Sequence, residues 1–115
     1  MSYDVMLKCP TCTCEGHEHY SIDIGNYTWN VSGMYHAAAP PNIETDSILY
    51  WMNGKIAGDV IWVLKFILAE MRDAPDVFRE MNPPNGWGDY EGAIRFIDGI
   101  LRECETHPTW ILEVT

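Results

Sequence analysis

The sequence from Lys55 to Arg72, KIAGDVIWVLKFILAEMR, decides the fold of this chain. Apolar residues recur in it at helical spacing, which predicts an α-helix over residues 55–73 with one buried face. That face consists of Ile56, Val60, Val63, Leu64, Ile67 and Met71. Lys65 interrupts the run, and its uncharged part is far shorter than the roughly 18 residues that a membrane span needs. We therefore expect a core helix and no membrane partner.

The same helix carries further apolar residues around most of its remaining surface. They are Ile61, Trp62, Phe66 and Leu68. A helix that is apolar nearly all round is buried on more than one side, by its own domain or by a partner. Because a small sheet covers only one side, the pattern predicts a homodimer through Ile61, Trp62 and Phe66.

Alternating residues predict two strands at the start of the chain and one at its end. The inward faces of the first two are Tyr3, Val5 and Leu7, then Tyr20, Ile22 and Ile24. Gly25 either ends the second strand or bulges it. These strands flank a Cys/His-rich loop at 9–19, which predicts an antiparallel hairpin. The closing strand covers residues 109–114, with Trp110, Leu112 and Val114 on one face.

Helical signals fill the middle of the chain. Short helices are expected near 32–39, capped by Asn30 or Ser32, near 46–53 and near 75–81. A second long helix covers 90–105, where Asp89 is a suitable N-cap. Its apolar stripe is Ala93, Ile94, Ile97, Ile100, Leu101 and Cys104. The sequence thus predicts an α+β domain over 1–115, with a small antiparallel sheet of about three strands packed against two main helices plus short helices.

Composition narrows the class of protein and of partner. The 115 residues fit one domain, and 47% of them are hydrophobic, as in ordinary globular proteins. Seven basic and seventeen acidic residues give a net charge of −10, which repels phosphate backbones, so no nucleic acid partner is expected. Residues 1–8 lack the basic start and apolar run of a signal peptide, which predicts a cytoplasmic location.

The loop at 9–19 carries a dense set of candidate metal ligands: Cys9, Cys12, Cys14, His17 and His19. A Cys-x-x-Cys turn presents two thiolates on one side, as in a zinc knuckle, and the histidines supply nitrogen ligands. The pattern predicts a structural zinc ion, although five ligands in so short a loop exceed the four that zinc takes.

Other interpretations of these cysteines remain open. Zinc sites usually draw their second ligand pair from further along the chain, and Cys104 and His107 are spaced to supply one. Cys104 is equally a small buried apolar residue, given its place on the helical stripe. A second interpretation is that the cysteines of the loop stay reduced and bind no metal. A redox Cys-x-x-Cys fits less well because no helix of a βαβ unit follows Cys12.

Two Asn-containing motifs are candidate ligand sites. In the first, Asn26, Thr28 and Asn30 share one side of an extended segment and form a polar row. The second, Asn82–Gly92, contains Trp87 and Asp89 within a dense cluster of turn residues. The structural interpretation is that these side chains satisfy backbone groups at turns and caps. The functional interpretation is that they bind a small polar ligand, such as a nucleotide.

These motifs also carry a resemblance. The relevant segments are N-Y-T-W-N, G-M-Y-H-A-A, N-G-K-I-A-G-D, E-M-N-P-P-N-G-W-G-D-Y-E-G and C-E-T-H-P. With the closing strand they cover most of the chain from Asn26 onward, and they resemble a family of small uncharacterised proteins carried by bacteriophages and other mobile elements of bacteria. Relatives often have His where this chain has Trp29. The resemblance implies fold and origin, and it implies no activity.

The sequence favours a binding module over an enzyme. It contains no G-x-S-x-G, P-loop or dinucleotide fingerprint. The first hypothesis is therefore a phage-type module, stabilised by zinc, that binds a host protein or a small polar ligand. The alternative is a small hydrolase or transferase in which His36 works with a nearby carboxylate, Asp89 or Glu91.

Overall fold

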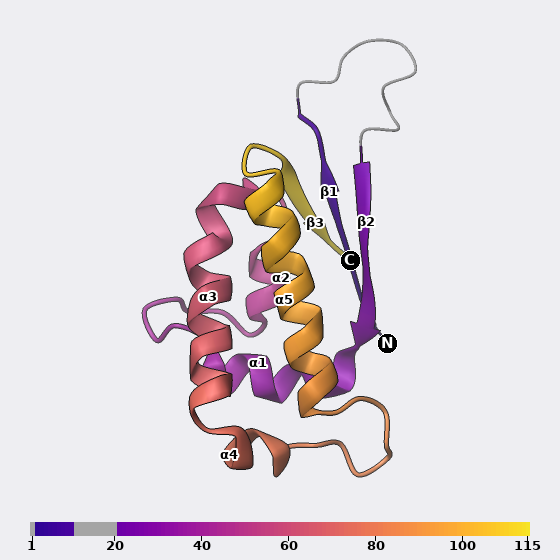
Figure 1. The fold of residues 1–115 in the computed structure, drawn as a ribbon, viewed down its shortest axis with the longest axis vertical. Helices are drawn as coiled ribbons and strands as arrows, with labels where there is room; N and C mark the ends of the chain where they lie inside the picture. The colour runs from indigo at the N-terminus through magenta and orange to yellow at the C-terminus, as the bar shows by residue number, and fades with distance from the viewer. Residues whose placement is uncertain (1, 11–20) are drawn as a thin grey trace.

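A three-stranded antiparallel sheet packs against the helices, which confirms the predicted α+β class (Figure 1). The structure is a computed structural model that describes residues 2–10 and 21–115. The central strand, β1 (Ser2–Lys8), pairs with β2 (Ser21–Thr28) on one side and β3 (Ile111–Val114) on the other. The two N-terminal strands and the C-terminal strand therefore form one sheet, as their alternating sequences predicted.

A β-bulge interrupts the pairing of β1 with β2. Val5 pairs with Gly25 and Met6 pairs with Asp23, so Ile24 is the extra residue. Gly25 has a φ of 135°, which glycine adopts without the strain that a side chain would bring. Its N–H donates to the Asp23 carboxylate at 3.0 Å. Of the two expectations for Gly25, the bulge is therefore the one observed, and β2 continues beyond it.

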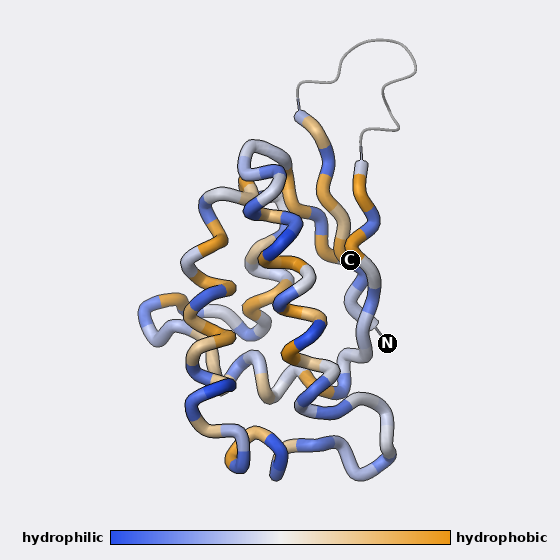
Figure 2. The backbone as a smooth tube through the Cα atoms, in the orientation of Figure 1, coloured by the Kyte–Doolittle hydropathy of each residue, from blue (hydrophilic) through white to orange (hydrophobic). Residues whose placement is uncertain are grey.

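Two long antiparallel helices cover one face of the sheet, and short helices close the ends of the layer (Figure 1). The long helices are α3 (Ala57–Asp73) and α5 (Tyr90–Thr106). The short ones are a 3₁₀ helix η2 (Trp29–Val31), α1 (Ser32–Ala38), α2 (Ile48–Trp51) and α4 (Pro75–Arg79). Figure 2 shows apolar segments along α3 and alternating apolar and polar segments along α5.

The buried face of α3 matches the predicted one except at its start. Val60, Val63, Leu64, Ile67 and Met71 are buried in the single core cluster of the described residues, together with Ala57 and Leu68. Ile56 is 44% exposed, so its assignment to the buried face was wrong. Leu112 N–H donates to the Lys55 carbonyl at 2.9 Å, and this pairing with β3 holds the chain extended until Ala57.

The second apolar side of α3 is only partly covered by the described residues. Ile61 and Phe66 are half-buried, whereas Trp62 is 49% exposed. Leu68 belongs to the core, so the open surface is narrower than the sequence suggested. This surface is the one that the predicted homodimer would use, and the dimer itself remains a prediction.

Cys104 is fully buried on the inner face of α5. Burial raises the pKa of its thiol to about 12, and the nearby carboxylates of Glu103 and Glu105 act in the same direction. The sequence offered a small apolar core residue as one interpretation of Cys104, and the structure confirms that interpretation.

We expect the fold to lose stability at alkaline pH through Cys104. Because its thiol pKa rises on folding from 9.0 to about 12, the stabilising contribution is complete below pH 9.0 and is lost as the pH rises toward 12. The unfolding free energy from urea denaturation should therefore fall with pH more steeply in the wild type than in Cys104→Ala. The difference in slope is at most about 1.4 kcal/mol per pH unit. Equal slopes would contradict this account.

Candidate functional site

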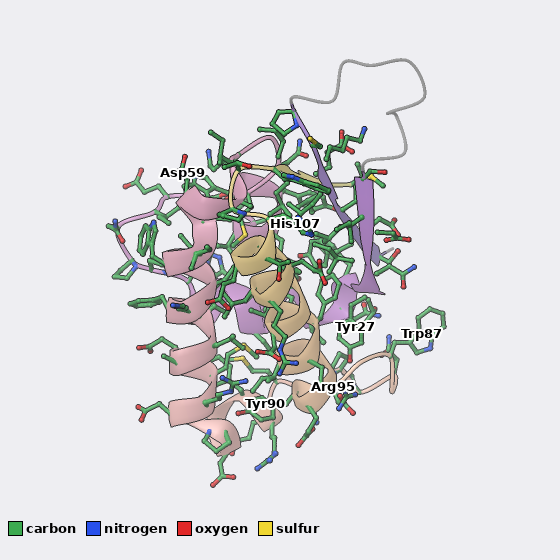
Figure 3. The ribbon with its side chains drawn as sticks, turned by 45° about the horizontal axis from the view of Figure 1, so that its top comes forward. Tyr27, Asp59, Trp87, Tyr90, Arg95 and His107 are labelled. Carbon is green, nitrogen blue, oxygen red and sulfur yellow. The ribbon has the colours of Figure 1, made fainter. Side chains whose placement is uncertain are left out.

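The two Asn-containing motifs meet in the structure through Tyr27. Tyr27 lies on β2, and its hydroxyl oxygen accepts a hydrogen bond from the backbone N–H of Asp89 at 3.0 Å (Figure 3). Its ring also packs against Phe96 of α5, with the ring centroids 5.8 Å apart. The sequence gave no reason to single out Tyr27, because a tyrosine between two polar residues of a strand is an ordinary pattern.

Glycines make this close approach between β2 and α5 possible. A Cβ atom at Gly92 would overlap the hydroxyl of Tyr27, and one at Gly88 would overlap the Thr28 methyl group. Gly88 also has a φ of 92°, which disfavours a side chain independently. The glycines of the second motif therefore accommodate the first motif, which explains why these residue types occur together.

The predicted polar row of Asn26, Thr28 and Asn30 is broken. Asn26 is exposed on β2, but the chain leaves the extended conformation at Trp29 and places Asn30 in the 3₁₀ helix. Thr28 is the N-cap of that helix, since its hydroxyl accepts from Asn30 N–H at 3.2 Å. The expectation that the three residues share one side was therefore wrong. The expected cap of α1 at Asn30 or Ser32 was also wrong, because the side-chain cap is Thr28, at the start of the preceding 3₁₀ helix.

The second motif forms a loop built from side chain to backbone hydrogen bonds. The Asn82 amide oxygen accepts from Tyr90 N–H at 2.8 Å, and the Asn85 oxygen accepts from Trp87 N–H at 3.0 Å. Asp89 caps α5 as predicted, accepting from Gly92 N–H at 2.7 Å. These polar side chains thus act on the backbone, as the structural interpretation held.

Trp87 is the exception within this loop. It is 67% exposed, more than any other large hydrophobic residue among those described. Figure 3 shows it standing out from the molecule beyond Tyr27. Trp29, 40% exposed, directly follows Thr28, the residue that faces Gly88. A loop held by hydrogen bonds therefore presents a large aromatic side chain to solvent.

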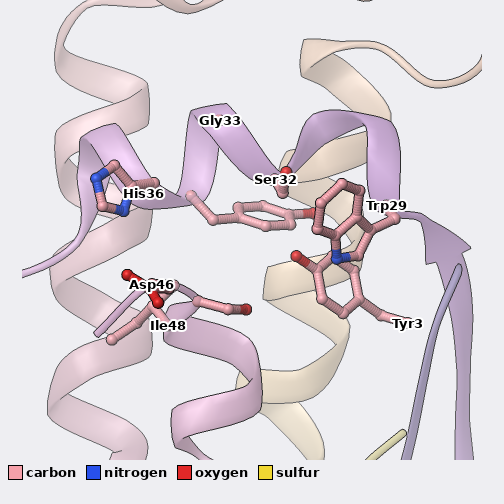
Figure 4. A pocket seen from close by; sticks show the side chains of 9 residues that line it. Tyr3, Trp29, Ser32, Gly33, His36, Asp46 and Ile48 are labelled. Carbon is pink, nitrogen blue, oxygen red and sulfur yellow. The ribbon is translucent and has the colours of Figure 1, made fainter. Parts of the chain in front are cut away.

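A separate pocket of about 280 Å³ lies between α1, β1 and the segment that leads into α2. Its lining includes Tyr3, Trp29, Ser32, His36, Asp46, Ser47 and Ile48. Figure 4 shows His36 and Asp46 at one end, with Trp29 and Tyr3 at the other. The sequence singled out His36, but it gave Asp46 no functional role because the residue looked like part of a helix start.

The carboxylates expected beside His36 are engaged elsewhere. Asp89 caps α5, and Glu91 pairs with Arg79 at 2.9 Å, so neither lines the pocket. The expected convergence of His36 with Asp89 or Glu91 was therefore wrong, and Asp46 takes that place.

As far as the structure describes it, the pocket lacks the hydrogen bond that activates a nucleophile. Among the described residues, no hydrogen bond joins His36 to the hydroxyl of Ser32 or Ser47, and the Ser47 hydroxyl instead accepts from Tyr50 N–H at 3.4 Å. Burial raises the pKa of Tyr3, an effect that the hydroxyls of Ser47 and Ser32 partly offset. The pocket thus offers aromatic surface, hydroxyl groups, the His36 imidazole and one carboxylate.

The predicted metal ligands fall mostly outside the described residues. Cys12, Cys14, His17 and His19 lie there, and Cys9 is half-buried at the end of β1. Within residues 2–10 and 21–115, no group of three or more His, Cys, Asp and Glu side chains is suited to hold a metal ion. The Cys104 thiol is buried in the core, and the His107 ring stacks on Trp110 at 4.1 Å. Zinc in the loop therefore stays a prediction.

A pair of glycines on α5 tests the role of Tyr27. We expect Gly99→Ala, where a Cβ meets open space, to stabilise the protein by up to about 1 kcal/mol, because alanine favours a helix over glycine. Gly92→Ala should destabilise it, since its Cβ would overlap the Tyr27 hydroxyl. Thermal unfolding measures both. If Gly92→Ala were as stable as Gly99→Ala, the close contact with Tyr27 would be disproved.

Comparison with known proteins adds nothing to this geometry. Within the described part of the chain, no helix has the length and apolar character to cross a membrane. No protein-family model matches the chain, and neither a curated protein nor a solved structure gives a match.

Proposed function

We propose that this chain is a small phage-type binding module whose Trp87 loop anchors a protein of the host cell, in the cytoplasm. The observation that carries the proposal is the exposed Trp87 at the tip of a hydrogen-bonded loop. The resemblance of the Asn82–Gly92 motif to phage proteins supports the origin. In this proposal the other candidate residues either support the Trp87 loop or lie at the edge of its binding surface. They are Asn26, Thr28, Asn30 and Asp89.

Exposing Trp87 works against stability, since apolar surface left in water forgoes about 25 cal/mol for each Å². The loop nevertheless holds the residue in place through the Asn85 side chain and through the capped start of α5. Tryptophan is enriched among residues that dominate binding energy at protein interfaces. A loop whose backbone is ordered before binding loses less conformational entropy when a partner docks. Both features support the proposal that Trp87 anchors the partner.

Charge defines the kind of partner. The net charge of −10 favours a protein with basic groups around an apolar pocket, because complementary charge speeds association and excludes wrong partners. The same charge disfavours nucleic acid. A partner that receives Trp87 in an apolar pocket rimmed by Lys or Arg fits both constraints.

Two exposed tryptophans give a matched test of this surface. We expect Trp87→Ala to weaken capture of the host partner at least about tenfold, as a central hot spot does. Trp62→Ala, which removes the exposed tryptophan of α3, should leave capture by the monomeric chain unchanged, so both variants are compared at concentrations where the chain is monomeric. Measured on the monomer, both variants should keep their stability within about 0.5 kcal/mol, as exposed substitutions usually do.

A photo-crosslinking residue at position 87 identifies the partner, and the same residue at position 62 is the control. Capture is then quantified with the purified partner by calorimetry. Equal loss of affinity in Trp87→Ala and Trp62→Ala, or no loss in either, would contradict the proposal.

Zinc and self-association complete the proposed function. We propose that four of the residues Cys9, Cys12, Cys14, His17 and His19 supply the ligands of one structural zinc ion. We also propose that two copies associate through Ile61, Trp62 and Phe66. Neither feature is required for the Trp87 surface, so each is tested separately.

Native mass spectrometry tests both expectations in one measurement. We expect a mass excess of one zinc ion per chain that a strong chelator removes, together with a dimer that Trp62→Ala converts to monomer. A folded chain free of zinc would refute the metal site. A monomer at high concentration in analytical ultracentrifugation would refute the dimer.

A hydrolase or transferase centred on His36 is the second candidate. The observation in its favour is that Asp46 lies at the same end of the pocket as His36, as an orienting carboxylate would (Figure 4). The missing hydrogen bond between His36 and a serine hydroxyl, within the described residues, is why binding is preferred.

A further inference from the structure

We propose that the pocket beside His36 binds a small arylalkylamine, with the aromatic ring against Trp29 and the ammonium group at Asp46. This inference goes beyond the proposed function, because Trp87 does not line the pocket and no protein partner is involved. It rests on the position of the aromatic residues, on the charge of the pocket and on its size.

The aromatic end of the pocket suits a flat apolar ring. Tyr3 is 1% exposed and supports this end of the pocket from behind, because its ring packs against Tyr50 with centroids 5.2 Å apart and against Tyr35 at 6.3 Å. Trp29 remains 40% exposed at the pocket mouth, so part of its indole is available to a ligand. Aromatic rings that pack together gain about 0.5–1.5 kcal/mol beyond the burial of their area.

The opposite end carries a solvent-exposed carboxylate that no basic residue of the described chain neutralises. Asp46 forms no ion pair with any described residue, and neither Lys nor Arg lines the pocket. His36 is the other titratable group at this end, and the Tyr3 hydroxyl lies at the aromatic end. A carboxylate of this kind attracts a cation, and a charge-assisted hydrogen bond from an ammonium group is stronger than a neutral one.

The separation of the two ends selects an elongated ligand over a compact one. Figure 4 shows Asp46 and His36 apart from Trp29 and Tyr3. An aromatic ring joined to an ammonium group by a short alkyl chain spans that arrangement, whereas a quaternary ammonium ion alone reaches one end. The pocket volume of about 280 Å³ lies just below the usual range for drug-sized ligands, which suits a small amine.

Charge also argues against the nucleotide that the sequence allowed. A phosphate would meet Asp46 without a described Lys or Arg in the pocket, in a chain of net charge −10. An anionic ligand is therefore disfavoured both locally and by the field of the whole protein.

Calorimetry with four matched probes tests the proposal on the full chain. Phenethylamine should bind, whereas 2-phenylethanol and 3-phenylpropionate keep the ring but lack the cation, and ethylamine keeps the cation but lacks the ring. We expect phenethylamine to bind at least about tenfold more tightly than each of the other three, the ratio that about 1.4 kcal/mol provides. Equal binding of phenethylamine and 2-phenylethanol, or no binding of phenethylamine, would overturn the proposal.

Variants then locate the site. Asp46→Asn should weaken phenethylamine binding at least about threefold, within the range of a charge-assisted hydrogen bond. Glu44→Gln, which removes the same charge from an exposed neighbour outside the pocket, should leave binding unchanged. The indole N–H signal of Trp29 should shift in nuclear magnetic resonance spectra on titration, while that of Trp62 stays. Equal effects of the two substitutions, or a Trp29 signal that does not move, would place the amine elsewhere and refute the site.

Discussion

The hydrogen bond between the Tyr27 hydroxyl and the backbone of Asp89 joins the sheet to the start of α5, at a distance of 3.0 Å. Both candidate surfaces depend on this junction. On one side it orients Asp89, whose side chain caps α5 and ends the loop that carries Trp87. On the other, β2 ends just after Tyr27 and turns into the 3₁₀ helix that carries Trp29. Trp87 and Trp29 are therefore both positioned by the contact between Tyr27 and Asp89.

Periodicity predicted the parts of this fold that are governed by burial. The stripes on α3 and α5, the inward residues of β1 and the cap at Asp89 follow from a repeat of 3.6 or 2 residues and from capping chemistry, both of which are local. The wrong assignment of Ile56 to the buried face has a non-local cause. The pairing that keeps Lys55 extended is with β3, which lies beyond residue 110 in the sequence. Burial alone could not reveal that constraint.

The candidate sites were less predictable for the same reason. Asn26, Thr28, Asn30 and Asp89 stood out as polar residues in unusual motifs, yet Thr28 and Asp89 serve the backbone as caps. Tyr27 and Asp46 looked ordinary, and their roles arise from contacts with elements far along the chain. Residue type and spacing identify a candidate motif. The partners of each side chain, which only the fold provides, distinguish a cap from a binding group.

Electrostatics connects the two surfaces in a further way. Of the seven basic residues, Arg95 alone has neither an ion-pair partner nor a cation–π partner among the described residues. The acidic excess therefore remains largely uncompensated at the surface, and Asp46 is part of it. In such a field a cationic ligand is attracted to the pocket and a basic rim is favoured around Trp87, while phosphate is repelled from both. One property of the composition thus restricts both partners, and the local arrangement of aromatic residues determines which surface each of them can occupy.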